Sequence, residues 1–380
     1  MSTSETLIVG GGLIGLSSAL ELARQGRKVR VIDAGTSRRP ASLAGAGLLA
    51  PLSHKQPEGP VARAAIAARG LWGDWLRDLA RDFDGPGDPK PIEYDTSGAL
   101  VAAATPDEVE ILHRVRNQAE ELGEPNETLD ASELRRLAPD LRQDIREGLL
   151  LQAEARVDNI SCFGAVERTV QALGVEIIRH TRIERIARTA TGIDLTTTSG
   201  RLTAGRVVLA TGCWTSLLEG VGEFPVRPVR GQMIRVTGAD WPWQGMIRVG
   251  NHYAVRRGPS DVLFGATVEE VGYEDHTTAE GLSSLTTAFA RAFPGLAGKP
   301  LVDSWSGLRP ACSDGNPIVG PWQDWPLFIA TGHHRDGILF APWTASQVGA
   351  WVASADSWQG TPEFSANRFA RDSTRQAPPI

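Results

Sequence analysis

The side chains best suited to chemistry lie near the C-terminus, in the segment TGHHRDGILFAP at 331–342. Two histidines, an arginine and an aspartate precede an apolar run there. Adjacent histidines in an extended segment point to opposite faces, so Asp336 would have to fold back to join either one at a metal ion. We therefore expect no metal site. Arg335 could bind an anionic ligand or pair with Asp336.

Two further residues could bind a carboxylate. Arg309 lies in SGLRPAC, and the planar fork of a guanidinium can hold both oxygens of a carboxylate at once. Tyr253 lies in NHYAVRR, with Asn251 two positions earlier on the same face of the expected strand. On the residues alone, Arg309 could instead satisfy carbonyls beside Pro310, and Tyr253 could be a packing aromatic. No Ser-His-Asp or Cys-His pattern is visible.

A dinucleotide fingerprint begins the chain. A short apolar strand at 6–9 is followed by Gly10-x-Gly12-x-x-Gly15, a helix, and a second strand at 28–32 that ends in Asp33. Glycines there allow a sharp turn and close approach of the backbone to a pyrophosphate, which the amides of the helix start can bind. The carboxylate is placed to take the ribose hydroxyls.

The segment after this unit indicates which dinucleotide binds. Tiny residues at 44–47 (Ala-Gly-Ala-Gly) would let a flat ring lie against backbone, although a flexible loop would look the same. A nicotinamide enzyme would continue with further strand–helix units, and these are not apparent. Only one fingerprint is present, which favours a flavin dinucleotide over a two-nucleotide reductase.

Composition excludes several classes of protein. The net charge of −6 argues against a nucleic-acid partner. The three cysteines are far apart and odd in number, which suits a reducing compartment. No stretch approaches the roughly 20 apolar residues of a membrane span, and the N-terminus lacks the pattern of a signal peptide. We expect a cytoplasmic protein without a membrane partner.

Local sequence patterns predict the helices and strands that position these residues. Thr105 with Glu108, and Asp130 with Glu133, are capping boxes that open helices. The segment 174–186 reads as one strand, and a second buried strand covers 207–210. From 225 to 270 short alternating strands predict an antiparallel sheet, with a hairpin turn inside RRGPSD. A helix is expected to begin at Ile338, with its amides toward the cofactor.

The sequence resembles the D-amino-acid oxidase family of flavoenzymes, and most closely its glycine oxidase branch associated with bacterial thiamine biosynthesis. Five stretches carry the resemblance: VGGGLIGLSSALELARQG with the later aspartate, AGAGLLAP, RVVLATGCW, PVRPVRGQM, and the pair SWSGLRPACSDGNPIVG and GHHRDGILFAP.

The resemblance implies an α/β fold with two discontinuous domains. A Rossmann-like FAD-binding domain of the glutathione-reductase type would comprise 1–85, 152–218 and 303–370. An antiparallel-sheet α+β substrate domain would comprise 86–151 and 219–302, and 371–380 would be a tail.

The implied activity is oxidative deamination of glycine, sarcosine or a small D-amino acid by hydride transfer to flavin N5. The products would be a 2-oxo acid, ammonia or an amine, and hydrogen peroxide from molecular oxygen. The alternatives are a D-amino-acid dehydrogenase that uses a respiratory acceptor, a biosynthetic amine oxidase with a specialised substrate, and a flavin-carrying subunit without turnover. Relatives are often tetrameric, so a homo-oligomer is possible.

The resemblance also assigns residues. Arg309, Tyr253 and Arg335 would be catalytic and, with Asn251, would bind substrate. Non-covalent FAD would be bound by Gly10, Gly12, Leu13, Ile14, Gly15, Asp33, Ala34, Ala44, Gly45, Ala46, Gly47, Leu48, Ile183, Thr211, Gly212, Trp214, His333, Arg335, Asp336, Gly337, Ile338 and Leu339.

Several residues depart from the family pattern. Trp343 is bulky where alanine is usual, which predicts a tighter pocket, and Trp241 and Trp243 could lie over its opening. Some relatives attach flavin through cysteine, but Cys312 is expected to be a small buried residue.

Overall fold

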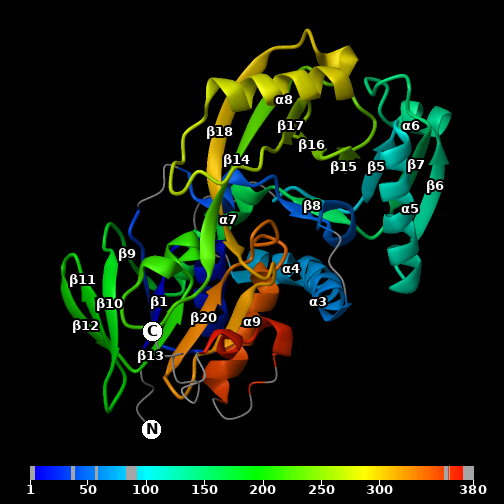
Figure 1. Ribbon diagram of the computed structural model, residues 1–380. Coiled ribbons are helices and arrows are strands. Elements are labelled where there is room, and N and C mark those ends of the chain that lie inside the picture. Colours follow the sequence, from blue (N-terminus) through cyan, green and yellow to red (C-terminus); the bar gives the residue numbers. More distant parts are fainter. Residues whose placement is uncertain are drawn as a thin grey trace, which may run out of the picture.

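The computed structural model describes residues 5–35, 39–55, 59–82, 92–354, 358 and 360–370. Two large sheets occupy different halves of the molecule, and Figure 1 shows them below and above the middle of the view. The predicted class, a parallel sheet with helices joined to a second, largely antiparallel sheet, is confirmed. The expected tail at 371–380 lies outside the described residues.

The six-stranded sheet has the order β19-β20-β13-β1-β2-β9. Its strands are β1 (Thr6–Val9), β2 (Val29–Ile32), β9 (Glu176–Ile178), β13 (Arg206–Leu209), β20 (Leu327–Thr331) and the antiparallel edge strand β19 (Ile318–Pro321). The other neighbours pair in parallel. The central strands are mostly apolar, with Leu7–Val9, Val207–Leu209 and Leu327–Ala330 buried, because both faces of the sheet are covered.

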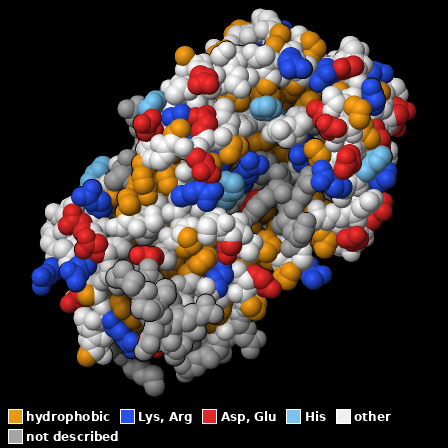
Figure 2. All heavy atoms as spheres, in the orientation of Figure 1, with side chains coloured by type: hydrophobic (Ala, Val, Ile, Leu, Met, Phe, Trp, Pro, Cys, Tyr) orange, Lys and Arg blue, Asp and Glu red, His pale blue; other side chains and the backbone are white. Residues whose placement is uncertain are grey.

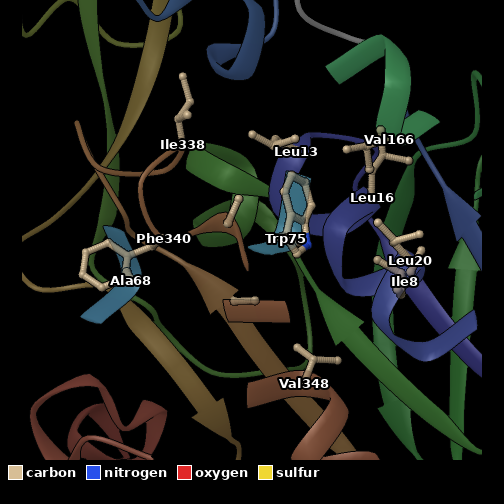
Figure 3. Close-up of a cluster of buried hydrophobic side chains, with 14 of the residues drawn as sticks. Ile8, Leu13, Leu16, Leu20, Ala68, Trp75, Val166, Ile338, Phe340 and Val348 are labelled. Atoms are coloured by element: carbon tan, nitrogen blue, oxygen red, sulfur yellow. The ribbon is translucent and has the colours of Figure 1, made fainter. Parts of the chain in front are cut away.

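Alternate residues of these strands face two different layers. Ile8 packs with helices α1 (Leu13–Arg24), α7 (Asn159–Ala172) and α9 (Ala341–Ala353), in the cluster that Figure 3 shows. Leu7 faces the three-stranded sheet of β10 (Ile183–Arg188), β11 (Ile193–Thr197) and β12 (Gly200–Ala204). The parallel sheet is therefore the middle of three layers.

The eight-stranded sheet has the order β18-β14-β17-β16-β15-β5-β7-β6. Its strands are β5 (Ala99–Ala103), β6 (Asn126–Asp130), β7 (Glu147–Leu151), β14 (Val226–Thr237), β15 (Met246–Val249), β16 (His252–Arg257), β17 (Asp261–Gly265) and β18 (Leu301–Cys312). One pair, β15 with β5, is parallel, and all other neighbouring strands of this sheet pair antiparallel.

Helices and loops cover both faces of this sheet. Helix α8 (Ala279–Ala292) lies across one face, as Figure 1 shows, with α6 (Ala131–Leu137) and η3 (Pro294–Leu296) in the same apolar cluster. Helix α5 (Pro106–Glu121) packs on the other face. Both predicted capping boxes are present, at the starts of α5 and α6.

The remaining elements fill the space between and around the sheets. They are α2 (Ala41–Ala44), the strands β3 (Leu48–Leu49), β4 (Tyr94–Asp95) and β8 (Ala155–Val157) of a small sheet, η1 (Pro51–Lys55), α3 (Gly59–Gly70), α4 (Trp72–Asp82), η2 (Gly212–Leu217), η5 (Pro362–Phe364) and η6 (Ala366–Phe369).

One expectation about the strands was wrong. Segment 174–186 is two strands, β9 and β10, in different sheets, and His180 between them has a left-handed backbone with a φ of +57°. The boundary expected at 303 lies inside β18, which pairs with β14 along most of its length. The division into domains stays a prediction.

The tryptophans expected over the pocket are instead part of the core. Trp241 is 1% exposed and donates through Nε1 to Asp140 at 2.8 Å, and Trp243 is also buried in the cluster under α8. Trp343 packs on Phe340 and Phe364 in the core of the parallel-sheet half, and it does not line the cleft described below.

Candidate active site and cofactor cleft

A cavity of about 720 Å³ runs along the carboxyl edge of the parallel sheet and reaches the face of the eight-stranded sheet. Strands β1, β2, β13 and β20 all end at this edge, which is where open α/β sheets bind ligands. The predicted residues that line it are Gly10, Gly12, Leu13, Ile14, Asp33, Ala34, Ala44, Gly45, Ala46, Gly47, Leu48, Ile183, Thr211, Gly212, Trp214, Tyr253, Arg309, His333, Arg335, Gly337 and Ile338.

Three predicted cofactor residues do not line the cleft. Gly15 is a packing glycine, since a Cβ there would lie 1.9 Å from the carbonyl oxygen of Gly10. Asp336 and Leu339 are buried, and the carbonyl of Asp336 accepts from the amide of Phe340 in the same turn at 2.9 Å. The carbonyl of Leu339 accepts from the indole of Trp72 at 3.0 Å, which holds its backbone in the core.

The start of α1 suits a phosphate. Gly12 is its N-cap without a side-chain capping bond, and the first turn holds no acidic residue. Gly10 has a φ of +113°, and a Cβ there would lie 2.3 Å from the carbonyl oxygen of Ala210. Among the first amides of this helix, that of Leu13 donates to Ser42 Oγ at 2.9 Å. The positive end of the helix is therefore open to the cleft for an anion.

Asp33 is fixed at the next strand end. Its Oδ2 accepts from the amide of Gly11 at 2.7 Å and its Oδ1 from the amide of Gly35 at 2.9 Å. Each carboxylate oxygen keeps a further lone pair, and the side chain lines the cleft. The geometry fits the two hydroxyls of a ribose, as the sequence predicted.

A wall of small residues faces the middle of the cleft. Gly47 has a φ of +77°, and a Cβ there would lie 1.8 Å from the carbonyl oxygen of Val157. The carbonyl of Ala46 accepts from Arg257 Nη2 at 2.9 Å, and that of Ala44 accepts from Trp305 Nε1 at 2.9 Å. These hydrogen bonds fix the position of the backbone at 44–47, and its small side chains leave room for a flat ring to lie against it. The cleft as a whole therefore fits FAD.

The histidine segment crosses the far side of the cleft as a turn. His334 has a φ of +52°, and its amide donates to the carbonyl of Pro310 at 2.8 Å. The ring of His333 bonds Thr344 Oγ1 at 3.0 Å, so it faces the core. The helix expected from Ile338 begins at 341 instead, because 337–340 forms a separate turn. The amides near the cleft thus belong to a turn and not to a helix end.

Beside the histidine segment, the guanidinium of Arg309 lies flat over the backbone of Gly231. It follows Gly307 on one face of β18, and Gly307 is paired with Gly231 of β14. A Cβ at Gly231 would lie 2.1 Å from Arg309 Nη2. Arg309 Nη1 also donates to the carbonyl of Thr267 at 3.2 Å. The glycine gives the guanidinium its space and its orientation.

Tyr253 stands beside this arginine and is 8% exposed. Its hydroxyl donates to Met233 Sδ at 3.7 Å. Burial raises the pKa of Tyr253, and the positive charges of Arg309 and Arg335 oppose that rise only in part. The hydroxyl is therefore a neutral donor, able to bond a carboxylate together with Arg309.

A second cavity of about 260 Å³ shares Tyr253 and Arg335 with the main cleft. Asn251 lines this smaller cavity and not the main one; it is an exposed residue of the turn between β15 and β16. His252 lies on the opposite face of the strand from Tyr253, where its ring stacks on Phe264 with centroids 5.2 Å apart.

Sequence reasoning missed several residues of the site. Ser42, which binds the start of α1, carried no motif of its own. The resemblance placed the backbone segment near 181–183 by the adenine but assigned only Ile183; Thr181 and Arg182 line the cleft beside it. Arg248 lines the smaller cavity directly across from Tyr253 in the β15–β16 hairpin. The two-residue connection Gly250-Asn251 was a readable hairpin signal.

Metal and thiol chemistry receive no support. Across the described residues, no group of three or more His, Cys, Asp or Glu side chains could hold a metal ion. Cys312 is 4% exposed, as expected for a buried packing residue, and burial together with Asp314 raises the pKa of its thiol to about 11. A helix long and apolar enough to cross a membrane is likewise missing from the described part of the chain.

Known proteins resemble this chain over most of its length. The family described as DAO, FAD dependent oxidoreductase, matches residues 5–351. A glycine oxidase of Pseudomonas putida is 32% identical over 350 residues, which are 90% of this chain and 92% of that protein. The bifunctional protein ThiO/ThiG of Synechocystis is 30% identical over all of this chain, which spans only 56% of that relative.

Solved structures of oxidases also resemble this chain over most of its length. Glycine oxidase from Geobacillus kaustophilus superposes with a TM-score of 0.88 at 28% identity, covering 95% of this chain and 98% of that one. Iminodiacetate oxidase from Chelativorans sp. BNC1 gives 0.83 at 25% identity, with the same two coverages.

Proposed function

This chain belongs to the DAO family of FAD-dependent oxidoreductases, and on that premise we propose that it oxidises the amine of a small amino acid, with oxygen as the electron acceptor. The proposed substrates are glycine, sarcosine and small D-amino acids. The observation that carries the proposal is the pair of Arg309 and Tyr253, which faces the same cleft as the dinucleotide fingerprint.

Arg309 and Tyr253 would bind the substrate carboxylate. The guanidinium is held flat by Gly231 and by the carbonyl of Thr267, so its fork is oriented before substrate arrives. The hydroxyl beside it adds a second kind of donor to the same anion. With the carboxylate fixed, the amine and the α-carbon have one approach to the middle of the cleft, and orientation of this kind lowers the barrier to reaction.

Bound FAD supplies the acceptor for the two electrons that leave the substrate. Among the described residues, the acidic side chains that line the main cleft are Asp33, Glu184 and Glu219, all at the adenosine end, so none is placed there as a base for the amine. The raised pKa of Tyr253 keeps the phenol from acting as a base. The amine would therefore bind already deprotonated, and the imine product would be hydrolysed by water to a 2-oxo acid.

Anaerobic mixing of the purified FAD-loaded enzyme with glycine, sarcosine and D-alanine tests this proposal. We expect at least one of them to bleach the flavin absorbance. In air, hydrogen peroxide should appear in proportion to the substrate consumed; its absence during turnover would favour a respiratory acceptor. The Arg309→Lys variant should retain FAD but lose most turnover. If no amino acid bleaches the flavin, the proposal is wrong.

A further inference from the structure

The smaller cavity contains more positive charge than one substrate carboxylate requires. It opens beside Tyr253 and Arg335, and its other described lining residues are Ser53, Met246, Arg248, Asn251, His252, Ala266 and Val268. None of these side chains is acidic. In Figure 2, Lys, Arg and His side chains, with Asp and Glu side chains among them, lie where the upper and lower halves of the molecule meet.

Arg248 is held so that its charge faces this cavity. It is paired with Tyr253 across the hairpin, and directly paired residues share one face of a sheet. Its Nη1 donates to the carbonyl of Ser53 at 2.6 Å and its Nε to the carbonyl of Gly250 at 3.0 Å. These two bonds use two of the five N–H groups of the guanidinium. The other three remain for a ligand, and the fork is already oriented.

The cations that surround the cavity also influence one another. Burial lowers the pKa of Arg248, and the positive charge of Arg335 lowers it further. Among the ion pairs that join described residues, none includes Arg248, Arg309 or Arg335. Partly buried like charges destabilise a fold unless something compensates them.

The carboxyl group of Glu154 influences this cluster but is hydrogen-bonded elsewhere. Glu154 acts on Arg248 electrostatically, but its two oxygens already accept hydrogen bonds from the backbone and side chain of Ser53 and from the amide of Leu52. A carboxylate bound at Arg309 and Tyr253 would compensate one cation. Arg248 and Arg335 would still face the cavity together.

We propose that the substrate carries a second carboxylate, which Arg248 and Arg335 bind in the smaller cavity while Arg309 and Tyr253 hold the first. This inference rests on the proposed amine oxidation and narrows its substrate class. The second carboxylate is carried either on the nitrogen, as in an N-carboxymethyl amino acid, or on the side chain, as in an acidic D-amino acid. A cavity of about 260 Å³ has room for a carboxymethyl group.

Binding of two ethers to the FAD-loaded enzyme tests the idea without turnover. Diglycolate and methoxyacetate both lack an amine, and they differ by one carboxylate. Calorimetry should show that diglycolate binds about 10-fold or more tightly, as expected for charge-assisted hydrogen bonds. In Arg248→Gln this preference should fall to about 2-fold or less, while methoxyacetate binding changes little.

Arg256→Gln is the matched control. Arg256 also donates to backbone carbonyls, those of Trp241 and Pro259, but it lines neither cavity. This variant should keep the full preference for diglycolate. Equal binding of the two ethers by the wild-type enzyme would overturn the inference. So would an Arg248→Gln variant that weakens both ethers equally, because that result would make the arginine a structural anchor only.

Turnover measurements then distinguish the two possible positions of the second carboxylate, on the nitrogen or on the side chain. Preferred oxidation of iminodiacetate over sarcosine would place the second carboxylate on the nitrogen, and preferred oxidation of D-aspartate over D-alanine would place it on the side chain. If the monocarboxylates are oxidised and diglycolate shows no advantage, only this inference fails. If diglycolate binds selectively but no amine bleaches the flavin, the proposed oxidation fails and the dicarboxylate site stands.

Discussion

Replacing the buried Glu154 by glutamine should change how the stability of the protein depends on pH. The residue is 1% exposed, and its Oε1 accepts from the amides of Leu52 at 2.7 Å and Ser53 at 2.9 Å. Burial raises the pKa of Glu154 from 4.5 to about 7, against the lowering effects of these bonds and of the positive charge of Arg69. The folded protein therefore holds a proton here that the unfolded chain has released.

The size of the effect follows from this difference in pKa. Between 4.5 and about 7 the folded state binds more protons than the unfolded state, so stability falls as pH rises. The contribution of the neutral carboxyl is complete below 4.5 and is lost as pH rises through about 7. A pKa displaced from 4.5 to about 7 corresponds to about 3 kcal/mol of unfolding free energy.

Glutamine cannot ionise, so the Glu154→Gln variant lacks this loss. Its stability should equal that of the wild type near pH 4.5 to within about 1 kcal/mol, and should exceed it by about 3 kcal/mol near pH 8. Urea unfolding of both proteins across this range, at one fixed excess of FAD, measures the difference, because the other titrating groups are shared. Ser53→Ala removes a bond that lowers the pKa of Glu154, so it should move the transition to higher pH. A stability difference that is constant with pH would refute the reasoning.

Three other substitutions test the site. Gly231→Ala places a Cβ 2.1 Å from Arg309 Nη2, so kcat/KM should fall by about 100-fold or more while the visible spectrum shows retained FAD. Asp33→Asn keeps the shape of the side chain but removes the negative charge that accepts from the amide of Gly11 and would accept from the ribose. The Kd for FAD, measured by titrating the apoprotein, should therefore rise about 10-fold. Tyr253→Phe should raise KM by about 10-fold and leave the pH profile of kcat unchanged, because the raised pKa keeps the phenol neutral; a lost alkaline limb in that profile would contradict this.

The parts of the fold that the sequence revealed have local causes. The β1–α1–β2 unit lies within thirty residues, and a Cβ at Gly15 of its fingerprint would meet the carbonyl of Gly10 in the same unit. The capping boxes of α5 and α6 need only four residues each. The turn after β16 was also correct, since its Gly-Pro-Ser sequence sets the backbone without help from the rest of the chain.

The failures have causes that lie far away in the sequence. The segment 174–186 splits because Asp33 holds both of its halves: the amide of Asp33 donates to the carbonyl of Ile178 at 2.9 Å, and the amide of Thr181 donates to the carbonyl of Asp33 at 3.0 Å. Between these two hydrogen bonds the chain must turn at His180, and the pattern of apolar residues in the sequence does not predict that turn. Trp241 was misplaced for a similar reason, since its partners Asp140 and Phe293 come from two other segments.

Arg248 differs from these failures because its position could have been derived. The sequence MIRVGNHYAV contains two apolar runs separated by Gly-Asn, which indicates a hairpin with a two-residue turn. That turn fixes the register, and the register pairs Arg248 with Tyr253. Once Tyr253 was assigned to a carboxylate, an arginine on the same face one strand away was already a candidate for a second anion. The structure adds what the pattern could not: the carbonyls of Ser53 and Gly250 that hold the guanidinium, and the approach of Arg335 from the other half of the molecule. The proposed specificity for a second carboxylate would therefore depend on a local hairpin for one cation and on tertiary packing for the other.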